Sequence, residues 1–160
     1  MINLLITDVD GTLTDSGMYY DDMGNEWKKF NTRDGKGIEL LQEKGIHVMF
    51  LTSEDTPIVK RRADKLHVEY CYMGIKDKMS FLNNFFLQQN DFSWDKTAYI
   101  GDDINDVFPM KHSKLSATPA DGTNQNKIVA DYICEHKGGE GCVREFCEYI
   151  IKKCEVSYEG

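Results

Sequence analysis

Long apolar runs are absent from this sequence. No stretch approaches the ~20 consecutive apolar residues that a membrane-spanning helix needs, so we expect no membrane partner. A basic leader is absent too, because Asp8 and Asp10 end the short apolar run that begins at Ile2. We therefore expect a cytoplasmic protein.

An excess of basic residues is also lacking. The formal net charge of −8 opposes non-specific binding to nucleic acid. No basic stripe with interleaved aromatic residues offsets that charge, so we expect no nucleic-acid partner. An anionic substrate then requires local cations and a metal ion in its site.

Cysteine pairs at metal-binding spacing are missing as well. The five cysteines form no Cys-x-x-Cys motif, and none lies beside a histidine at ligand spacing. We interpret them as reduced thiols that fill the core and the faces of helices.

The apolar residues that are present alternate between strand-like runs and helical patterns. Hydrophobic residues make up 41% of the 160 positions, enough for a single packed domain over 1–160. Alternating strands and helices are typical of a parallel sheet, which predicts a doubly wound, Rossmann-like α/β fold. The predicted strands are 3–7, 47–51, 97–100, 114–118 and a short edge strand at 132–134. The predicted helices are 35–44, 57–66, 76–89 and 141–153.

Two local features refine this prediction. Asp34 is a plausible N-cap for the helix at 35–44, and Gly45 a plausible C-terminal stop. The segment 17–30 departs from the alternation, because two short polar-apolar runs flank the turn-forming residues 21–25. It predicts an inserted β-hairpin that acts as a flap.

A first acidic motif, Asp8-Val9-Asp10-Gly11-Thr12, directly follows the first predicted strand. Open α/β sheets bind ligands at the carboxyl ends of their strands, where both carboxylates emerge. Two aspartates this close repel each other unless a cation lies nearby. Mg²⁺ prefers oxygen ligands and needs only one or two carboxylates, so the motif favours a magnesium site.

A second acidic segment, Gly101 to Asp106, follows the predicted strand at 97–100. The two acidic strand ends can share one ion. Each segment alone is equally compatible with an ordinary strand-to-helix turn. Likewise, Lys78 alone is typical of a solvated helix residue, and Thr52 alone of a strand-end hydroxyl. The occurrence of both acidic segments together with Thr52 and Lys78, in this order along the chain, argues against interpreting each one separately.

In these motifs the sequence resembles the haloacid dehalogenase superfamily of phosphatases. The resemblance implies that Asp8 is the nucleophile and Asp10 the general acid and base. It also implies that Thr52 and Lys78 contact the phosphoryl group. Its metal ligands would be Asp8, the backbone carbonyl of Asp10, and Asp102, with Mg²⁺ as the cofactor. Asp103 and Asp106 are then expected to order their loop or its waters.

Finer features resemble one branch of this superfamily, which dephosphorylates 2-keto-3-deoxy sugar acids. They are the short chain without a cap domain, the inserted hairpin, the segment 30–35 and the segment 136–145. Members of that branch form homotetramers, in which neighbouring subunits cover the open site. The resemblance therefore implies a phosphorylated sugar acid as substrate and a homotetramer as the assembly.

The residues after Thr52 bear on which sugar acid is bound. In phosphatases for 3-deoxy-D-manno-octulosonate 8-phosphate a Gly-Arg pair usually follows the threonine, whereas Ser53-Glu54 follows it here. Glu54 together with Lys65 resembles the phosphatases for 2-keto-3-deoxynononate 9-phosphate, which predicts that substrate, with the eight-carbon acid as the alternative. Ser53 and Glu54 are then substrate-binding residues. Alternatively, Glu54 is an exposed acid at a helix start, where its negative charge interacts favourably with the helix dipole.

Arg33 is a candidate for the substrate carboxylate, since a guanidinium group matches a carboxylate in shape and charge. Alternatively, and with equal weight, Arg33 forms an ion pair at the base of the hairpin or between subunits.

Two functions of other classes compete with the phosphatase. A phospho-receiver domain has its acidic pair after the first strand and its phosphorylated aspartate later, which is the reverse of the order seen here. A silent assembly domain would not need Asp8, Asp10, Lys78 and Asp102 intact. We therefore expect an enzyme, a phosphoric monoester hydrolase.

Overall fold

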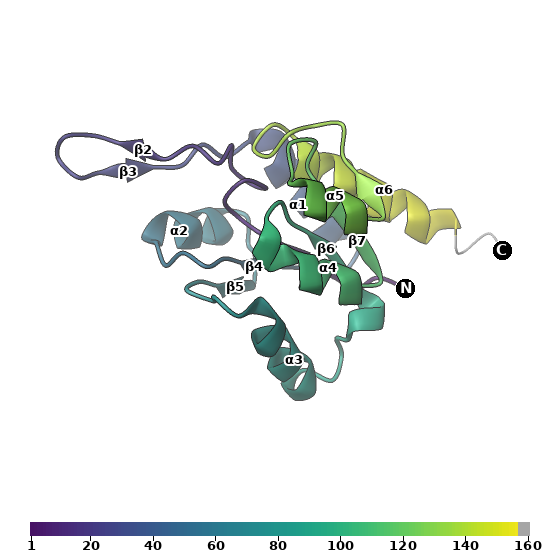
Figure 1. The fold of residues 1–160 in the computed structure, drawn as a ribbon. Helices are drawn as coiled ribbons and strands as arrows, with labels where there is room; N and C mark the ends of the chain where they lie inside the picture. Colours follow the sequence, from purple (N-terminus) through teal and green to yellow (C-terminus); the bar gives the residue numbers. More distant parts are fainter. Residues whose placement is uncertain (157–160) are drawn as a thin grey trace.

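The structure, a computed structural model, describes residues 1–156, and its centre is a six-stranded parallel sheet (Figure 1). All neighbouring strands in it pair in parallel, which confirms the predicted α/β class. In spatial order the strands are β5 (Tyr70–Tyr72), β4 (His47–Leu51), β1 (Leu4–Thr7), β6 (Thr97–Ile100), β7 (Leu115–Thr118) and β8 (Tyr132–Ile133).

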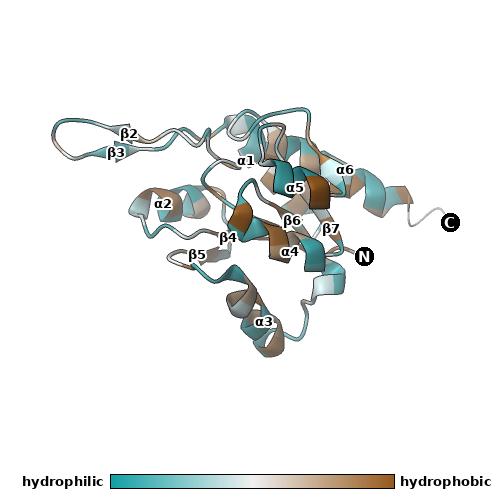
Figure 2. Ribbon diagram, viewed as in Figure 1, coloured by the Kyte–Doolittle hydropathy of each residue, from teal (hydrophilic) through white to brown (hydrophobic). Residues whose placement is uncertain are grey.

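Six helices in the described chain lie against both faces of this sheet. They are α1 (Thr32–Glu43), α2 (Pro57–Lys65), α3 (Lys78–Gln88), α4 (Val107–His112), α5 (Asn124–Val129) and α6 (Cys142–Val156). Two short 3₁₀ helices precede β6 and α4, at Trp94–Lys96 and Ile104–Asp106. Figure 2 shows that the helices carry both hydrophobic and hydrophilic residues, as expected for helices with one buried face.

The two faces of the sheet form separate hydrophobic cores. Side chains alternate along a strand, so Leu5 packs with α1, α2 and α6, while Leu4 and Ile6 pack with α3 and α4 on the other face. All four residues of β1 are buried. A strand covered on both faces is mostly apolar, which explains why the strand predictions lie within one residue of the observed bounds.

Asp34 is not the N-cap of α1, in contrast to the prediction. The helix starts earlier, and the Asn31 side chain caps it by accepting a hydrogen bond from the Arg33 N–H at 2.8 Å. Asp34 is buried and instead accepts a hydrogen bond from the Arg144 N–H near the start of α6. Asparagine and aspartate are equally good caps, so propensity could not separate them. The predicted stop at Gly45 is confirmed, since it has φ +76° just after the helix.

Three elements were missed by the sequence analysis: β5, α4 and α5. They are three to six residues long. Such short elements contain too few residues for their periodicity to be recognised. Among residues 1–156, no helix is long and apolar enough to cross a membrane.

The inserted hairpin is confirmed, with shorter strands than predicted. β2 (Tyr19–Tyr20) pairs in antiparallel fashion with β3 (Glu26–Trp27), and the Asp21 carboxylate closes the turn by accepting hydrogen bonds from the N–H groups of Met23 and Asn25. In Figure 1 the hairpin projects away from the sheet and its helices. Its outer residues, 18–20 and 22–25, are exposed.

Candidate active site

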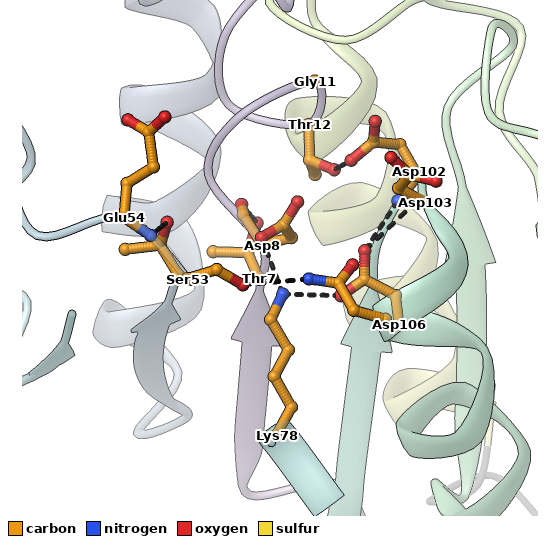
Figure 3. A network of polar contacts seen from close by, with 12 residues as sticks. Thr7, Asp8, Gly11, Thr12, Ser53, Glu54, Lys78, Asp102, Asp103 and Asp106 are labelled. Carbon is orange, nitrogen blue, oxygen red and sulfur yellow. Dashed lines mark hydrogen bonds and ion pairs between the residues drawn. The ribbon is translucent and has the colours of Figure 1, made fainter. Parts of the chain in front are cut away.

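The chemically important side chains follow three adjacent strands. Asp8 follows β1, Thr52 follows β4, and Asp102 follows β6 after one glycine. Since β1 lies between β4 and β6 and all three are parallel, their carboxyl ends meet at one edge of the sheet. Figure 3 shows Asp8, Asp102 and Asp106 gathered at this edge.

Lys78, the first residue of α3, reaches this edge from a different element. Its ammonium Nζ lies 2.7 Å from Asp8 Oδ1 and 2.7 Å from Asp106 Oδ1, and its side chain is 0% exposed (Figure 3). Burial lowers the pKa of a lysine, but the negative charges of Asp8 and Asp106 outweigh it, so the pKa of Lys78 is raised. Lys78 is thus a buried cation and not a solvated helix residue.

Asp106 has every carboxylate oxygen occupied by donors. Besides Lys78, its Oδ1 accepts a hydrogen bond from the Tyr99 hydroxyl at 2.6 Å. Its Oδ2 accepts from the N–H groups of Asp102 and Asp103 at 3.1 and 3.3 Å. These contacts hold the loop after β6, as the sequence predicted for Asp106. The role of Tyr99 was missed, because a tyrosine in a buried strand carries no sequence signal of a polar contact.

Asp102 is oriented by the two residues that follow Asp10. Its Oδ1 accepts a hydrogen bond from the Thr12 hydroxyl at 3.1 Å. A Cβ atom on Gly11 would lie 2.1 Å from Asp102 Oδ2, and Gly11 has φ +87°. The first acidic motif therefore requires glycine for both space and backbone conformation.

The donor set at this edge fits a divalent cation. Asp8, Asp102 and Asp106 each offer a carboxylate oxygen, and these atoms lie within 4.8 Å of one another. Burial and the charges of neighbouring carboxylates raise the pKa of both Asp8 and Asp102. Each oxygen of Asp106 already accepts two hydrogen bonds, so Asp8 and Asp102 have more capacity left to hold the ion. Hard oxygen donors of this kind suit Mg²⁺.

The Asp10 side chain has a partner that the sequence analysis missed. Lys28, which directly follows β3, lies with its Nζ 2.6 Å from Asp10 Oδ1 and 3.0 Å from Glu54 Oε2. Its side chain is 1% exposed. Nothing in the sequence separates Lys28 from its neighbour Lys29, because both belong to an exposed-looking hairpin.

The loop after β4 places the predicted residues Thr52, Ser53 and Glu54 near the carboxylate cluster. Thr52 is buried, and its Oγ1 accepts a hydrogen bond from the Glu54 N–H at 3.2 Å. Ser53 Oγ accepts from Asn105 Nδ2 at 3.0 Å, which links this loop to the loop after β6. Thr52, Ser53 and Glu54 therefore border the carboxylate cluster.

Two predicted substrate-binding residues, Arg33 and Lys65, lie in helices α1 and α2 and not in the loops after β1, β4 and β6. Arg33 is exposed in the first turn of α1 and lines a hollow with His136 and Arg144 at the start of α6. Lys65 is exposed at the last position of α2, whereas Glu54 precedes the first. The nine residues of α2 span about 13 Å, so Lys65 lies at the far end of this helix from Glu54. Within one chain, Lys28 and not Lys65 is the cation that contacts Glu54.

No protein-family model matches the chain. Curated relatives do match it over most of their length. The chain is 34% identical over 151 residues to the 3-deoxy-D-manno-octulosonate 8-phosphate phosphatase KdsC of Haemophilus influenzae, covering 94% of this chain and 83% of that one. It is 37% identical over 150 residues to KdsC of Yersinia pestis, covering 94% and 80%.

Solved structures agree with these relatives. A probable YrbI family phosphatase from Pseudomonas syringae has a TM-score of 0.91 and 33% identity, covering 99% of this chain and 93% of that one. A 3-deoxy-D-manno-octulosonate 8-phosphate phosphatase from Moraxella catarrhalis, in complex with a magnesium ion, a phosphate ion and a KDO molecule, has a TM-score of 0.90 and 32% identity, covering 99% and 94%.

Proposed function

The chain belongs to the haloacid dehalogenase superfamily, in the capless branch that includes the KdsC phosphatases. We therefore propose that it removes the phosphate from phosphorylated 2-keto-3-deoxy sugar acids with Mg²⁺ as its cofactor. The single observation that carries this proposal is the buried Lys78 ammonium between Asp8 and Asp106, beside Asp102. Phosphoryl transfer depends mainly on positioning and charge stabilisation, and this cluster supplies both signs of charge at fixed distances.

We assign the covalent step to Asp8. An Asp8 oxygen forms a bond to phosphorus while the bond from phosphorus to the sugar oxygen breaks, and Asp10 gives its proton to that oxygen. A water molecule then attacks phosphorus, Asp10 takes a proton from the water, and the bond between Asp8 and phosphorus breaks. Inorganic phosphate is released and Asp8 is restored.

Mg²⁺ would be held by the carboxylates of Asp8 and Asp102 and by the backbone carbonyl of Asp10, and when bound it neutralises charge on the phosphate oxygens. Thr52 is proposed to donate a hydrogen bond to the phosphoryl group. Lys78 contributes its positive charge to the same group and holds Asp8 in place.

More narrowly, we propose 2-keto-3-deoxynononate 9-phosphate as the substrate. Glu54 lies two residues after Thr52, and its side chain is 42% exposed, so its free acceptor capacity can meet hydroxyl groups of the leaving sugar. A site built to bond a hydroxyl discriminates against substrates that leave the site unpaired. The eight-carbon 3-deoxy-D-manno-octulosonate 8-phosphate is the second candidate, and the names of the relatives favour it.

The experiment is a comparison of kcat/KM for the two substrates in the parent and in Glu54→Ala. We expect the parent to prefer the nine-carbon substrate and the variant to lose part of that preference. Asp55→Ala, at the exposed next position, is the matched control and should keep the parent's ratio. A parent that prefers the eight-carbon substrate, or a Glu54→Ala variant with an unchanged ratio, contradicts the assignment.

We also propose a homotetramer. The hairpin exposes large apolar side chains, which are Met18, Tyr19, Tyr20, Met23 and Trp27, and these suit burial against other subunits. Arg33 and Lys65 would then reach the substrate from a neighbouring subunit. Light scattering on the purified protein measures the assembly directly, and a monomer at micromolar concentration would contradict the proposal.

A further inference from the structure

Lys28, which directly follows β3, contacts the loop after β1 that carries Asp8 and Asp10, here called the catalytic loop. Its Nζ lies 2.6 Å from Asp10, 3.0 Å from Glu54 and 3.6 Å from Glu26. These three carboxylates come from the loop after β1, the loop after β4 and the hairpin itself. One ammonium group of the hairpin therefore connects it to the loops after β1 and β4.

The exposures around this group distinguish it from a surface ion pair. The Lys28 side chain is 1% exposed, whereas the Asp10, Glu54 and Glu26 side chains are 31%, 42% and 28% exposed. Surface pairs contribute little because solvent competes for both charges. Here the cation is enclosed and the carboxylates retain access to solvent and to a bound molecule. The arrangement fixes the orientation of the carboxylates and leaves their outer oxygens free.

Comparison with the neighbouring Lys29 shows that this enclosure by carboxylates is specific to Lys28. Lys29 is exposed, and its positive charge helps to lower the pKa of Asp15. Alternate residues of an extended segment point to opposite sides, so Lys28 faces the catalytic loop and Lys29 faces solvent.

We infer that Lys28 is a positioning residue that sets the Asp10 carboxyl for proton transfer to the leaving oxygen and holds Glu54 beside the leaving group. Proton transfer requires the acid within hydrogen-bond reach of its target, and an unrestrained aspartate samples several rotamers. The part concerning Glu54 rests on the proposed function. The part concerning Asp10 applies to any phosphate ester whose leaving group must be protonated.

Substrates that differ in their leaving group separate these effects. p-Nitrophenolate leaves without a proton, ethoxide needs one from Asp10, and a sugar acid needs the proton and also offers hydroxyls to Glu54. Because kcat/KM reports the steps up to formation of the phosphorylated Asp8, it isolates the step in which Asp10 acts as an acid.

Lys28→Met keeps the aliphatic stem and removes the charge. We expect it to lower kcat/KM for ethyl phosphate roughly 10-fold or more beyond any loss with p-nitrophenyl phosphate. The loss with the sugar-acid phosphate should be larger still, by the factor that Glu54→Ala alone produces. Lys28→Arg should recover much of the loss, and Lys29→Met is the matched control that should behave as the parent.

A merely structural role predicts a different pattern. Equal losses with ethyl phosphate and p-nitrophenyl phosphate, or no loss with either, overturn the inference. In an Asp10→Asn background, Lys28→Met should cause no further loss with ethyl phosphate, and additive losses likewise overturn it. If Lys28→Met is unstable by thermal melting, Lys28→Gln must show the same selective loss.

The outcome also separates this inference from the proposed function. A parent enzyme inactive on every sugar-acid phosphate contradicts the proposed substrate class. The comparison of ethyl phosphate with p-nitrophenyl phosphate still decides the role of Lys28 in that case.

Discussion

The Asp34 carboxylate in α1 accepts a hydrogen bond at 2.9 Å from the backbone N–H of Arg144, 110 residues later in the chain. Asp34 thus satisfies an N–H group in the first turn of α6, which would otherwise lack an acceptor. The two helices are also in close contact at Gly37, where a Cβ atom would lie 2.8 Å from the Arg144 Cα. Asp34, in the first turn of α1, therefore bonds the backbone of a neighbouring helix and does not cap its own.

Asp34→Asn should change the pH dependence of stability. Burial raises the pKa of Asp34 to about 6, despite the N–H groups of Arg144 and Val143, from a value of 3.8 for an unburied group. Between these values the folded state binds more protons than the unfolded state, so ionisation of Asp34 lowers the free energy of unfolding as the pH rises toward 6. Asparagine stays neutral and avoids this loss.

The difference in unfolding free energy, variant minus parent, should therefore rise by about 2 kcal/mol between pH 4 and pH 7. Urea unfolding at both pH values measures this difference. Asp91→Asn, at an exposed position, is the control. A difference that does not change with pH contradicts the assigned burial effect.

Asp8→Asn should abolish turnover while leaving the fold intact, because the amide is nearly isosteric but cannot attack phosphorus. Asp10→Asn should lower the rate by ~10²–10⁴-fold, as expected for lost acid and base catalysis. Phosphate release measures both, and Asp22→Asn in the exposed hairpin turn is the control. Full activity of either variant would remove that residue from its role.

Lys78→Met should reduce both stability and activity. The variant leaves the buried carboxylates of Asp8 and Asp106 without their shared cation, which typically costs about 3–5 kcal/mol. Loss of a charge directed at the phosphoryl group typically costs ~10²–10³-fold in kcat. Lys76→Met, exposed two residues earlier, should match the parent in urea unfolding and in turnover. Parent-like stability of Lys78→Met is incompatible with the buried ion pairs.

Removal of Mg²⁺ by a chelator should abolish activity, and excess Mg²⁺ should restore it. Ca²⁺ should restore much less, because it prefers more ligands and longer bonds than Mg²⁺. Small displacements of the attacking oxygen are costly in an in-line reaction. Phosphate release with each metal measures this, and activity that persists in excess chelator contradicts the metal assignment.

The sequence by itself determined the sheet and the two acidic strand ends. Buried parallel strands are mostly apolar, so β1, β4 and β6 are visible as short, largely apolar runs. Charged residues are tolerated only where such strands end, and this marked Asp8 and Asp102 as functional candidates. Gly45 was predictable for a similar local reason, because a left-handed residue commonly ends a helix.

Only the tertiary structure decided which charges meet. Lys28 and Lys29 are equivalent in sequence, yet one is enclosed by three carboxylates and the other is exposed. Asp34 and Asn31 are both good helix caps, and the packing of α1 on α6 assigns them to different helices. Such partners are set by the docking of distant segments, whose energies depend on geometry and desolvation that local sequence patterns do not encode.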